Sequence, residues 1–384
     1  MPDWYFQQIE YPVLWSEIEL TIPSYWEYNV LLQGYESLVI NTAEEVTVPA
    51  PFLPARDGTD PVYKAAKRHY AVQNIPALRE YEHTNSLKNY LSKITFDIAS
   101  YLSPHQSYRQ NFATTCLNDF NYVIVNAEYE GKSHLLDAAA AMSSIGQLPT
   151  YCFNEKGFCV KDKKTFEWLS LMPDKSAAQM HRYEMKLAAD GSLEGVYKAR
   201  YTNTEAMLLR EALADMKPDD IKQYWLKKHK GLTIKSFKIT NLDTLSKPIN
   251  IEAEIKIEGK TQVTDKIIYL NPIFYDNITE NPFKAETRRT PIHYKYIFNT
   301  DISVKIDIPE GYIVDELPKN TTLVLADNSA KASINFASKP NQIELSSKIA
   351  ISQHTFKQST YLDLREWYNV VIAKQSEQIV LKIK

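Results

Sequence analysis

Three residues near the middle of the chain have side chains that thiol chemistry could use. Cys116 is a potential nucleophile, Tyr122 follows it, and Asp137 lies near the end of the segment NDFNYVIVNAEYEGKSHLLDAAAA at 118–141. A thiol acyl-transfer or peptide-cleaving site needs a cysteine, a histidine that takes its proton and an aspartate that orients the imidazole. A phenol, with an ordinary pKa of about 10, cannot replace imidazole as a base at neutral pH. The segment therefore offers a thiol and a carboxylate without an evident base.

Two short strands joined by the turn 130–132 are expected to hold Tyr122 and Asp137. The stretch ATTCLND around Cys116 leaves little room for a helix before the first strand, so this cysteine is not expected to be catalytic. Each residue also has a structural interpretation, because Asp137 can cap a turn and Tyr122 can fill a strand face. His134 alternates toward the face opposite Asp137, which argues against it as a displaced base.

Composition excludes several classes of protein. The chain has 384 residues, 44% hydrophobic content and a formal net charge of −3, so it can bury a large core but has no overall basic field for nucleic acid. No run approaches the roughly 20 apolar residues of a membrane span, and the start MPDWYFQQ lacks the regions of an export signal. The histidines are scattered singly, and the sequence has neither a CxxC pair nor a Gly-rich phosphate loop. We therefore expect no metal site and no cofactor.

The first part of the chain predicts a β domain. Residues 16–41 alternate apolar and polar positions, and 88–102 have the same strand pattern, whereas a short helix is possible at 63–69. The aromatic residues at the start are interpreted as strand core and sheet face, with an exposed stacking platform for sugars or peptides as the alternative. They are Trp4, Tyr5, Phe6, Tyr11, Trp15, Tyr25, Trp26 and Tyr28.

The segment after Asp137 predicts hairpins followed by helices. Residues 147–160 suggest a strand, a turn and a strand, in which Cys152 and Cys159 either pair as a disulfide or remain reduced. Residues 180–203 predict an antiparallel hairpin about Asp190-Gly191. Helices are expected at 204–230, the first capped by Thr204, the second starting near Pro218 and ending at Gly231.

The last part of the chain predicts a β-sandwich. Residues 232–352 form short alternating runs separated by turn residues, as in two packed antiparallel sheets. A helix is expected at 362–376 and a final strand after it, because the apolar residues there keep helical spacing before QIVLKIK. The stretch TENPFKAETRRTP, with Arg288 and Arg289, is interpreted as a solvated turn, the alternative being a recognition loop.

A series of long stretches, occurring in a fixed order, identifies relatives of this chain. They are PDWYFQQIEYPVLWSEIELTIPSYWEYNVLLQGY, NIPALREYEHTNSLKNYLSKITFDIAS, FNYVIVNAEYEGKSHLLDAA, ITNLDTLSKPINIEAEI, YLNPIFYDNITENPFKAETRR, IPEGYIVDELP and YLDLREWYNVVIAKQSEQIVLK. Together they resemble a bacterial family of secreted transglutaminase-like proteins within the transglutaminase and cysteine-protease superfamily. The resemblance implies a thiol-enzyme domain between an N-terminal β domain and a C-terminal β-sandwich.

The same resemblance aligns Asp137 with the family's aspartate and places Tyr122 where the family has its histidine. In active members the thiol lies at the N-terminus of a helix roughly forty to sixty residues ahead of the histidine strand, where the helix dipole favours thiolate. Here only about eighteen residues separate Leu102 from Phe120, too few for the missing helices. A truncated, inactive member is therefore expected, with Asp137, Tyr122 and Cys116 as vestigial site residues.

These observations combine into one hypothesis. The chain is expected to be mainly β, α+β overall, with an incomplete N-terminal β domain at 1–103, a transglutaminase-like remnant at 104–172 and the sandwich with its helices at 173–384. Its expected function is that of a non-catalytic, periplasmic or secreted scaffold that binds a protein, peptide or glycan, and an unpaired sheet edge would favour self-association. The alternative is a cysteine-dependent transglutaminase or peptidase that uses Cys116 with Asp137 and a distant histidine.

Overall fold

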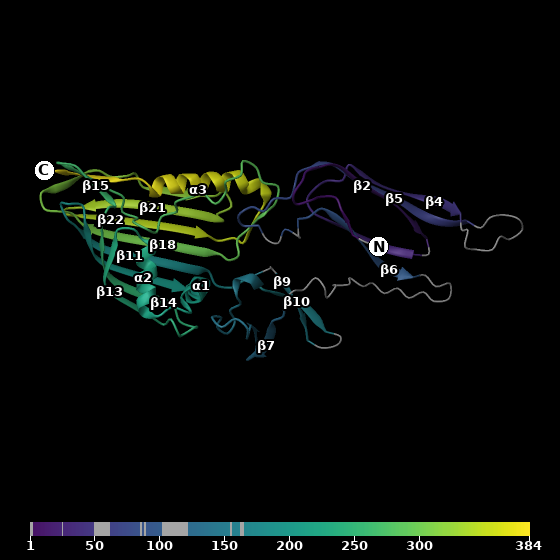
Figure 1. Cartoon of the computed structure of the whole chain (residues 1–384), viewed down its shortest axis with the longest axis horizontal. Helices are drawn as coiled ribbons and strands as arrows, with labels where there is room; N and C mark the ends of the chain where they lie inside the picture. The colour runs from purple at the N-terminus through teal and green to yellow at the C-terminus, as the bar shows by residue number, and fades with distance from the viewer. Residues whose placement is uncertain are drawn as a thin grey trace, which may run out of the picture. The chain divides into compact units, whose positions relative to one another are not determined.

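A computed structural model describes residues 3–24, 26–49, 62–84, 87, 90–101, 122–153, 156–161 and 165–384. The chain divides into two compact units, the first comprising residues 1–121 with Arg288–Pro291 and the second Tyr122–Thr287 with Ile292–Lys384. Strands dominate both units, so the prediction of a mainly β fold is confirmed (Figure 1). The three predicted domain boundaries stay a prediction.

The first unit consists of two three-stranded antiparallel sheets, with the orders β1-β6-β3 and β2-β5-β4. Its core includes Phe6, Tyr70 and Ile94. The helix considered at 63–69 is wrong, because these residues lie in β5 and pair with strands on both sides. The alanines and lysines of YKAAKRH favour a helix locally, but pairing on two edges overrides that preference. The strands are β1 (Trp4–Tyr5), β2 (Val13–Pro23), β3 (Trp26–Gln33), β4 (Ile40–Pro49), β5 (Val62–Ile75) and β6 (Lys93–Tyr101).

The N-terminal aromatic residues do not form a continuous core. Phe6 is buried in the first unit, whereas Trp4, Tyr5 and Trp15 lie on exposed faces of β1 and β2, as the sheet-face interpretation allows. Tyr11 is exposed outside the strands, so neither the core nor the sheet-face interpretation holds for it. Tyr25 and the side chain of Trp26 lie outside the described residues. The stacking platform that an exposed aromatic set would provide stays a prediction.

Arg288 is a buried anchor of the first unit rather than a residue of a solvated turn. It is 2% exposed and donates hydrogen bonds to the backbone oxygens of Glu82 at 2.6 Å and His83 at 3.1 Å, and to two carbonyls of its own segment. Arg289, next in sequence, is exposed and lies 3.0 Å from Glu36. The solvated-turn interpretation is wrong for Arg288 because its planar group satisfies several carbonyls at once.

The second unit is built on an eight-stranded sheet with the order β13-β14-β12-β11-β18-β22-β21-β20 (Figure 1). A four-stranded sheet, β15-β16-β24-β19, shares one core with it, in which Ile302, Val304 and Ile306 of the large sheet join Ile268 and Leu381 of the small one. This arrangement is the predicted sandwich. The described sheets are antiparallel as predicted except at one pairing, between β11 and β18, which run parallel and come from segments far apart in sequence.

The strand bounds of the second unit follow in chain order. They are β7 (Val125–Tyr129), β8 (Lys132–Leu136), β9 (Lys156–Val160), β10 (Phe166–Ser170), β11 (Ala177–Leu187), β12 (Leu193–Thr202), β13 (Leu232–Thr240), β14 (Ile249–Ile257), β15 (Thr261–Val263), β16 (Ile267–Leu270), β17 (Ile292–His293), β18 (Phe298–Asp307), β19 (Tyr312–Glu316), β20 (Thr321–Val324), β21 (Ala330–Lys339), β22 (Gln342–Ile351), β23 (Thr355–Phe356) and β24 (Ile379–Ile383). The pairs β7-β8, β9-β10 and β17-β23 form separate two-stranded ladders.

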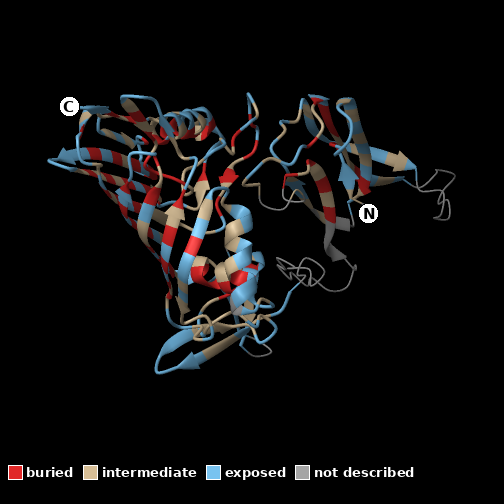
Figure 2. Cartoon of the chain, turned by 60° about the vertical axis from the view of Figure 1, so that its left-hand side comes forward, coloured by how far each residue is buried: buried red, intermediate tan, exposed pale blue. Residues whose placement is uncertain are grey.

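Helices α1 (Asn203–Leu213), α2 (Pro218–Lys228) and α3 (Tyr361–Gln375) lie close to the predicted positions. The predicted cap is wrong, because Thr202 precedes the first helix and Thr204 is buried within its first turn. All three helices pack on the buried face of the large sheet. Along its strands, buried and exposed residues alternate, so the opposite face stays polar (Figure 2).

Candidate functional site

The hairpin of β7 and β8 brings the two predicted site residues of the described chain together. Glu130 and Gly131 form its turn with φ angles of 50° and 71°, as a tight two-residue connection requires. Tyr122 precedes the first strand and Asp137 follows the second, so both lie at the open end of the ladder. The Tyr122 hydroxyl donates a hydrogen bond to Asp137 Oδ2 at 2.8 Å. The hairpin prediction is confirmed, although its first strand begins at Val125 and leaves Tyr122 in the preceding loop.

Tyr151 is a third member of this cluster. Its hydroxyl lies 3.0 Å from that of Tyr122 and 3.4 Å from Asp137 Oδ2, and the two rings meet edge to face at 5.1 Å. Asp137 Oδ1 accepts the Ala139 amide at 2.9 Å, so this carboxylate also caps its turn, as its structural interpretation expected. No spacing in the sequence indicates Tyr151, because it reaches the cluster from the 3-10 turn Thr150–Cys152.

The strand predicted at the start of 147–160 is wrong, because residues there form this 3-10 turn. Pro149 precedes it in an extended conformation, and the amides of Cys152 and Phe153 donate to the carbonyls of Pro149 and Thr150. Proline supplies no amide for a strand ladder and favours the start of a turn. Leu148, Cys152 and Phe153 then form a small buried cluster beside the hairpin.

Electrostatics keep the Tyr122 phenol protonated. Its hydrogen bonds with Tyr151 and Asp137 raise the pKa of Tyr122 well above the ordinary value, since an ionised phenolate could not donate to the carboxylate. Tyr122 is 42% exposed and Tyr151 is 61% exposed, so solvent reaches the cluster. A neutral phenol that donates to Asp137 occupies the hydrogen bond an imidazole would need, and it cannot accept a thiol proton at neutral pH.

The cysteines do not complete a thiol site in the described part of the chain. Cys116 lies outside the described residues. Cys152, adjacent to Tyr151, is buried, and burial together with the nearby Asp137 charge raises the pKa of its thiol to about 11. Cys159 lies on β9 and is half-buried; both thiols are free, so the disulfide alternative is wrong. His134 makes no hydrogen bond to the cluster among the described residues.

A second polar cluster lies within the sandwich core. His181 Nδ1 is 2.9 Å from the Tyr197 hydroxyl and 3.3 Å from Asp276 Oδ1, and Tyr183 donates to the other Asp276 oxygen at 2.6 Å. The sequence presents His181 as an isolated histidine, because its partner is far along the chain. No described cysteine takes part, so this pairing satisfies buried polar groups without supplying a nucleophile.

No group of three His, Cys, Asp or Glu side chains suited to a metal ion occurs among the described residues. Within the same residues, no helix combines the length and the apolar character needed to cross a bilayer.

Comparisons with known proteins place part of the chain in context. Residues 266–381 match the family described as "Domain of Unknown Function with solved-structure structure (DUF3858)". No curated protein matches the chain. A solved structure, of a "putative protease" from Parabacteroides distasonis ATCC 8503, is similar with a TM-score of 0.44 and 10% identity, over 99% of this chain and 74% of that one. The family match covers β16 to α3 and most of β24, and the Tyr122–Asp137–Tyr151 cluster lies outside it.

Proposed function

We propose that this protein is a non-catalytic scaffold or binding protein of the transglutaminase-like type that acts outside the cytoplasm. One observation carries the proposal: the Tyr122 hydroxyl donates to Asp137 at 2.8 Å, in the place where the resemblance puts an imidazole. Tyr151 adds a second phenol to the same carboxylate. The cluster therefore fastens the end of the hairpin, and its acid does not orient a base.

The chemistry of the described thiols supports the same proposal. A catalytic cysteine is activated by a lowered pKa or by an adjacent base, whereas burial and the Asp137 charge hold the pKa of Cys152 at about 11. Cys159 lies in a strand ladder opposite Glu167, and the side chain that contacts its sulfur, the Asn126 amide at 4.0 Å, is not a base. The extracytoplasmic location rests on the family resemblance of the sequence.

The alternative function is thiol-dependent acyl transfer or peptide cleavage that uses Cys116. The full chain is incubated with a glutamine-containing protein and a fluorescent primary amine, and separately with a peptide library, beside variants Cys116→Ala and Cys159→Ala. We expect no turnover by any of the three proteins. Turnover that Cys116→Ala abolishes and Cys159→Ala preserves would establish the enzyme and refute the proposal.

The alkylation rate of Cys116 supplies an independent test of the proposal. In a chain carrying Cys152→Ala and Cys159→Ala, the remaining thiol of Cys116 is alkylated with iodoacetamide over a range of pH. We expect half-maximal rate at about pH 8.5, the ordinary value for a thiol. A midpoint below about pH 7 would indicate an activated thiolate and contradict an inert site.

A further inference from the structure

One face of the eight-stranded sheet remains uncovered within the described part of the second unit. Its other face packs against the four-stranded sheet and the three helices. Strand residues pointing to the uncovered face are mostly charged or hydroxylated, and along β11 they are Met180, Arg182, Glu184 and Lys186. This face is hollowed, with a volume of about 650 Å³ near the ends of the strands that carry Met180 and Arg200.

The strand registers arrange the lining of the hollow in two rows that cross the sheet from β13 to β22. Neighbours in a row belong to adjacent strands, about 4.8 Å apart, so each row spans about 24 Å. The first row consists of Thr240, Asn250, Arg200, Met180, Asp301 and Lys348. The second row consists of Lys238, Glu252, Lys198, Arg182, Ser303 and Ser346.

The hollow has an excess of positive charge that the rest of the chain lacks. Five basic side chains and two carboxylates line it. Lys198 pairs with Glu252 at 3.0 Å, whereas Arg200, Lys238 and Lys348 have no carboxylate within 4 Å among the described residues. Three exposed cations therefore stand on one concave surface without an ion-pair partner, in a protein whose formal net charge is −3.

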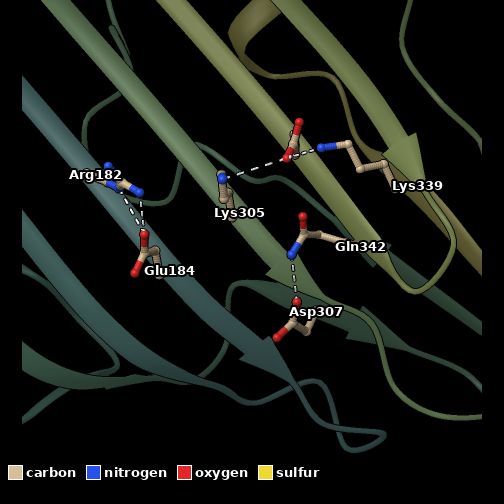
Figure 3. Close-up of polar contacts among 7 residues, drawn as sticks. Arg182, Glu184, Lys305, Asp307, Lys339 and Gln342 are labelled. Atoms are coloured by element: carbon tan, nitrogen blue, oxygen red, sulfur yellow. Dashed lines mark hydrogen bonds and ion pairs between the residues drawn. The ribbon is translucent and has the colours of Figure 1, made fainter.

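The next row along the strands has the opposite character and limits the basic area. Its members Glu254, Glu184 and Glu344 bring three carboxylates, with Lys305 as the cation between them. Figure 3 shows this part of the face, where Arg182 reaches Glu184 and Gln342 donates to Asp307 at 2.9 Å. A ligand attracted by the cations is thus confined to the first two rows and oriented across the strands.

We propose that this hollow binds a linear acidic polysaccharide, whose carboxylate or sulfate groups meet the three unpaired cations. Between the cations lie neutral hydrogen-bonding side chains, Thr240, Asn250, Ser303 and Ser346, which suit the hydroxyl groups of a sugar chain. Met180 is the lining residue with a large exposed apolar side chain, so apolar peptide side chains find little to contact. Among the described residues, the hollow is lined by no Phe, Tyr or Trp, and its one imidazole, that of His181, is buried against Tyr197 and Asp276. This lining disfavours single-stranded nucleic acid, since its bases stack on exposed aromatic rings.

This inference goes beyond the proposed function, because it concerns another surface and holds whether or not Cys116 reacts. Binding of the full chain to polygalacturonate and to chondroitin sulfate is measured by calorimetry, beside neutral dextran, polyglutamate and oligothymidylate. We expect binding to one or both acidic polysaccharides that weakens with added salt, no binding to dextran, and weaker binding to the other two polyanions. Preference for polygalacturonate or for chondroitin sulfate identifies carboxylate or sulfate as the recognised group.

The combined variant Arg200→Gln, Lys238→Gln, Lys348→Gln is expected to bind about tenfold more weakly, since it removes three exposed ion pairs with the ligand. A control variant, Lys186→Gln, Lys305→Gln, Lys331→Gln, loses the same charge from the same face outside the two rows and should bind like the wild type. Ser303→Glu keeps every cation, adds a carboxylate within the hollow and should also weaken binding. Any of three results would refute the proposal. The chain binds neither polysaccharide, it binds polyglutamate or oligothymidylate equally well, or the two combined variants lose the same amount of affinity.

Discussion

Arg210 offers the sharpest test of how the second unit is held together. This residue of α1 is 2% exposed, and its guanidinium donates to four backbone oxygens of the connection between β13 and β14. The acceptors are Leu242 at 3.0 Å, Asn241 at 2.9 Å, Thr244 at 2.9 Å and Lys247 at 2.6 Å. Burial lowers the pKa of Arg210, but a guanidinium stays charged at any pH at which the protein folds.

Arg210→Met keeps an unbranched side chain as far as the position of Nε, lacks the rest of the guanidinium and removes all four hydrogen bonds. A hydrogen bond from a charged group contributes about 1.5 kcal/mol or more, but water can reach part of the half-exposed connection. We therefore expect the free energy of unfolding to fall by about 3–4 kcal/mol, and the unfolding temperature of the second unit by roughly 10 °C. Calorimetry of the full chain measures the temperature, and urea unfolding followed by tryptophan fluorescence measures the free energy.

Two variants control this experiment. Arg182→Met removes an arginine whose side chain is 56% exposed and whose partner, Glu184, is on the solvent-facing side of the sheet, so stability should change by less than about 0.5 kcal/mol. Arg210→Lys keeps the charge but loses the planar fork, and should recover less than half of the lost stability. A loss below about 1 kcal/mol for Arg210→Met would mean that water satisfies the four carbonyls, and the reasoning would fail.

Three further predictions concern pH and backbone packing. The pKa of the Cys152 thiol is raised to about 11, so on raising the pH the unfolded chain loses this proton before the folded chain does. The contribution of the buried thiol to the free energy of unfolding is therefore present below about pH 9 and declines toward pH 11. Cys152→Ser should remove this decline from an unfolding profile measured at alkaline pH. Burial lowers the pKa of His83 to about 4, so the stability of the first unit should decline as pH falls from about 6.5 to about 4. His83→Asn should flatten that decline in unfolding measured across acid pH, since asparagine tolerates the φ of 58° found at this position. An unchanged profile would contradict the prediction. Gly195→Ala places a Cβ 2.0 Å from the Glu184 carbonyl oxygen, so urea unfolding should show a loss of more than about 2 kcal/mol; wild-type stability would show that β11 and β12 can separate at no cost.

Local chemistry accounts for the elements that the sequence predicts correctly. Gly191, Glu130 and Gly131 adopt the positive φ angles that their tight turns require, so both hairpins are evident without any tertiary information. The helix α3 is similarly evident, since Leu364, Trp367 and Val371 recur at helical spacing and are all buried.

The wrong predictions share one physical cause, which is contact between residues distant in sequence. Residues 63–69 have the composition of a helix but lie between β2 and β4, whose amides and carbonyls they satisfy. Arg288 is a charged residue in a polar stretch, yet it is buried because carbonyls about two hundred residues earlier accept its protons. Tyr151 joins Asp137 for a similar reason, through a turn that packs beside the hairpin.

The sequence alone determined that strands far outnumber helices and which residues of each strand share a face, because side-chain alternation is a property of the local backbone. It also indicated that Tyr122 and Asp137 belong to one hairpin, near the beginning of its first strand and the end of its second. Only the tertiary structure decided which strands are neighbours. Arg200, Lys238 and Lys348 come from β12, β13 and β22, and they line one hollow because strand order in the sheet is fixed by long-range packing and not by local pattern.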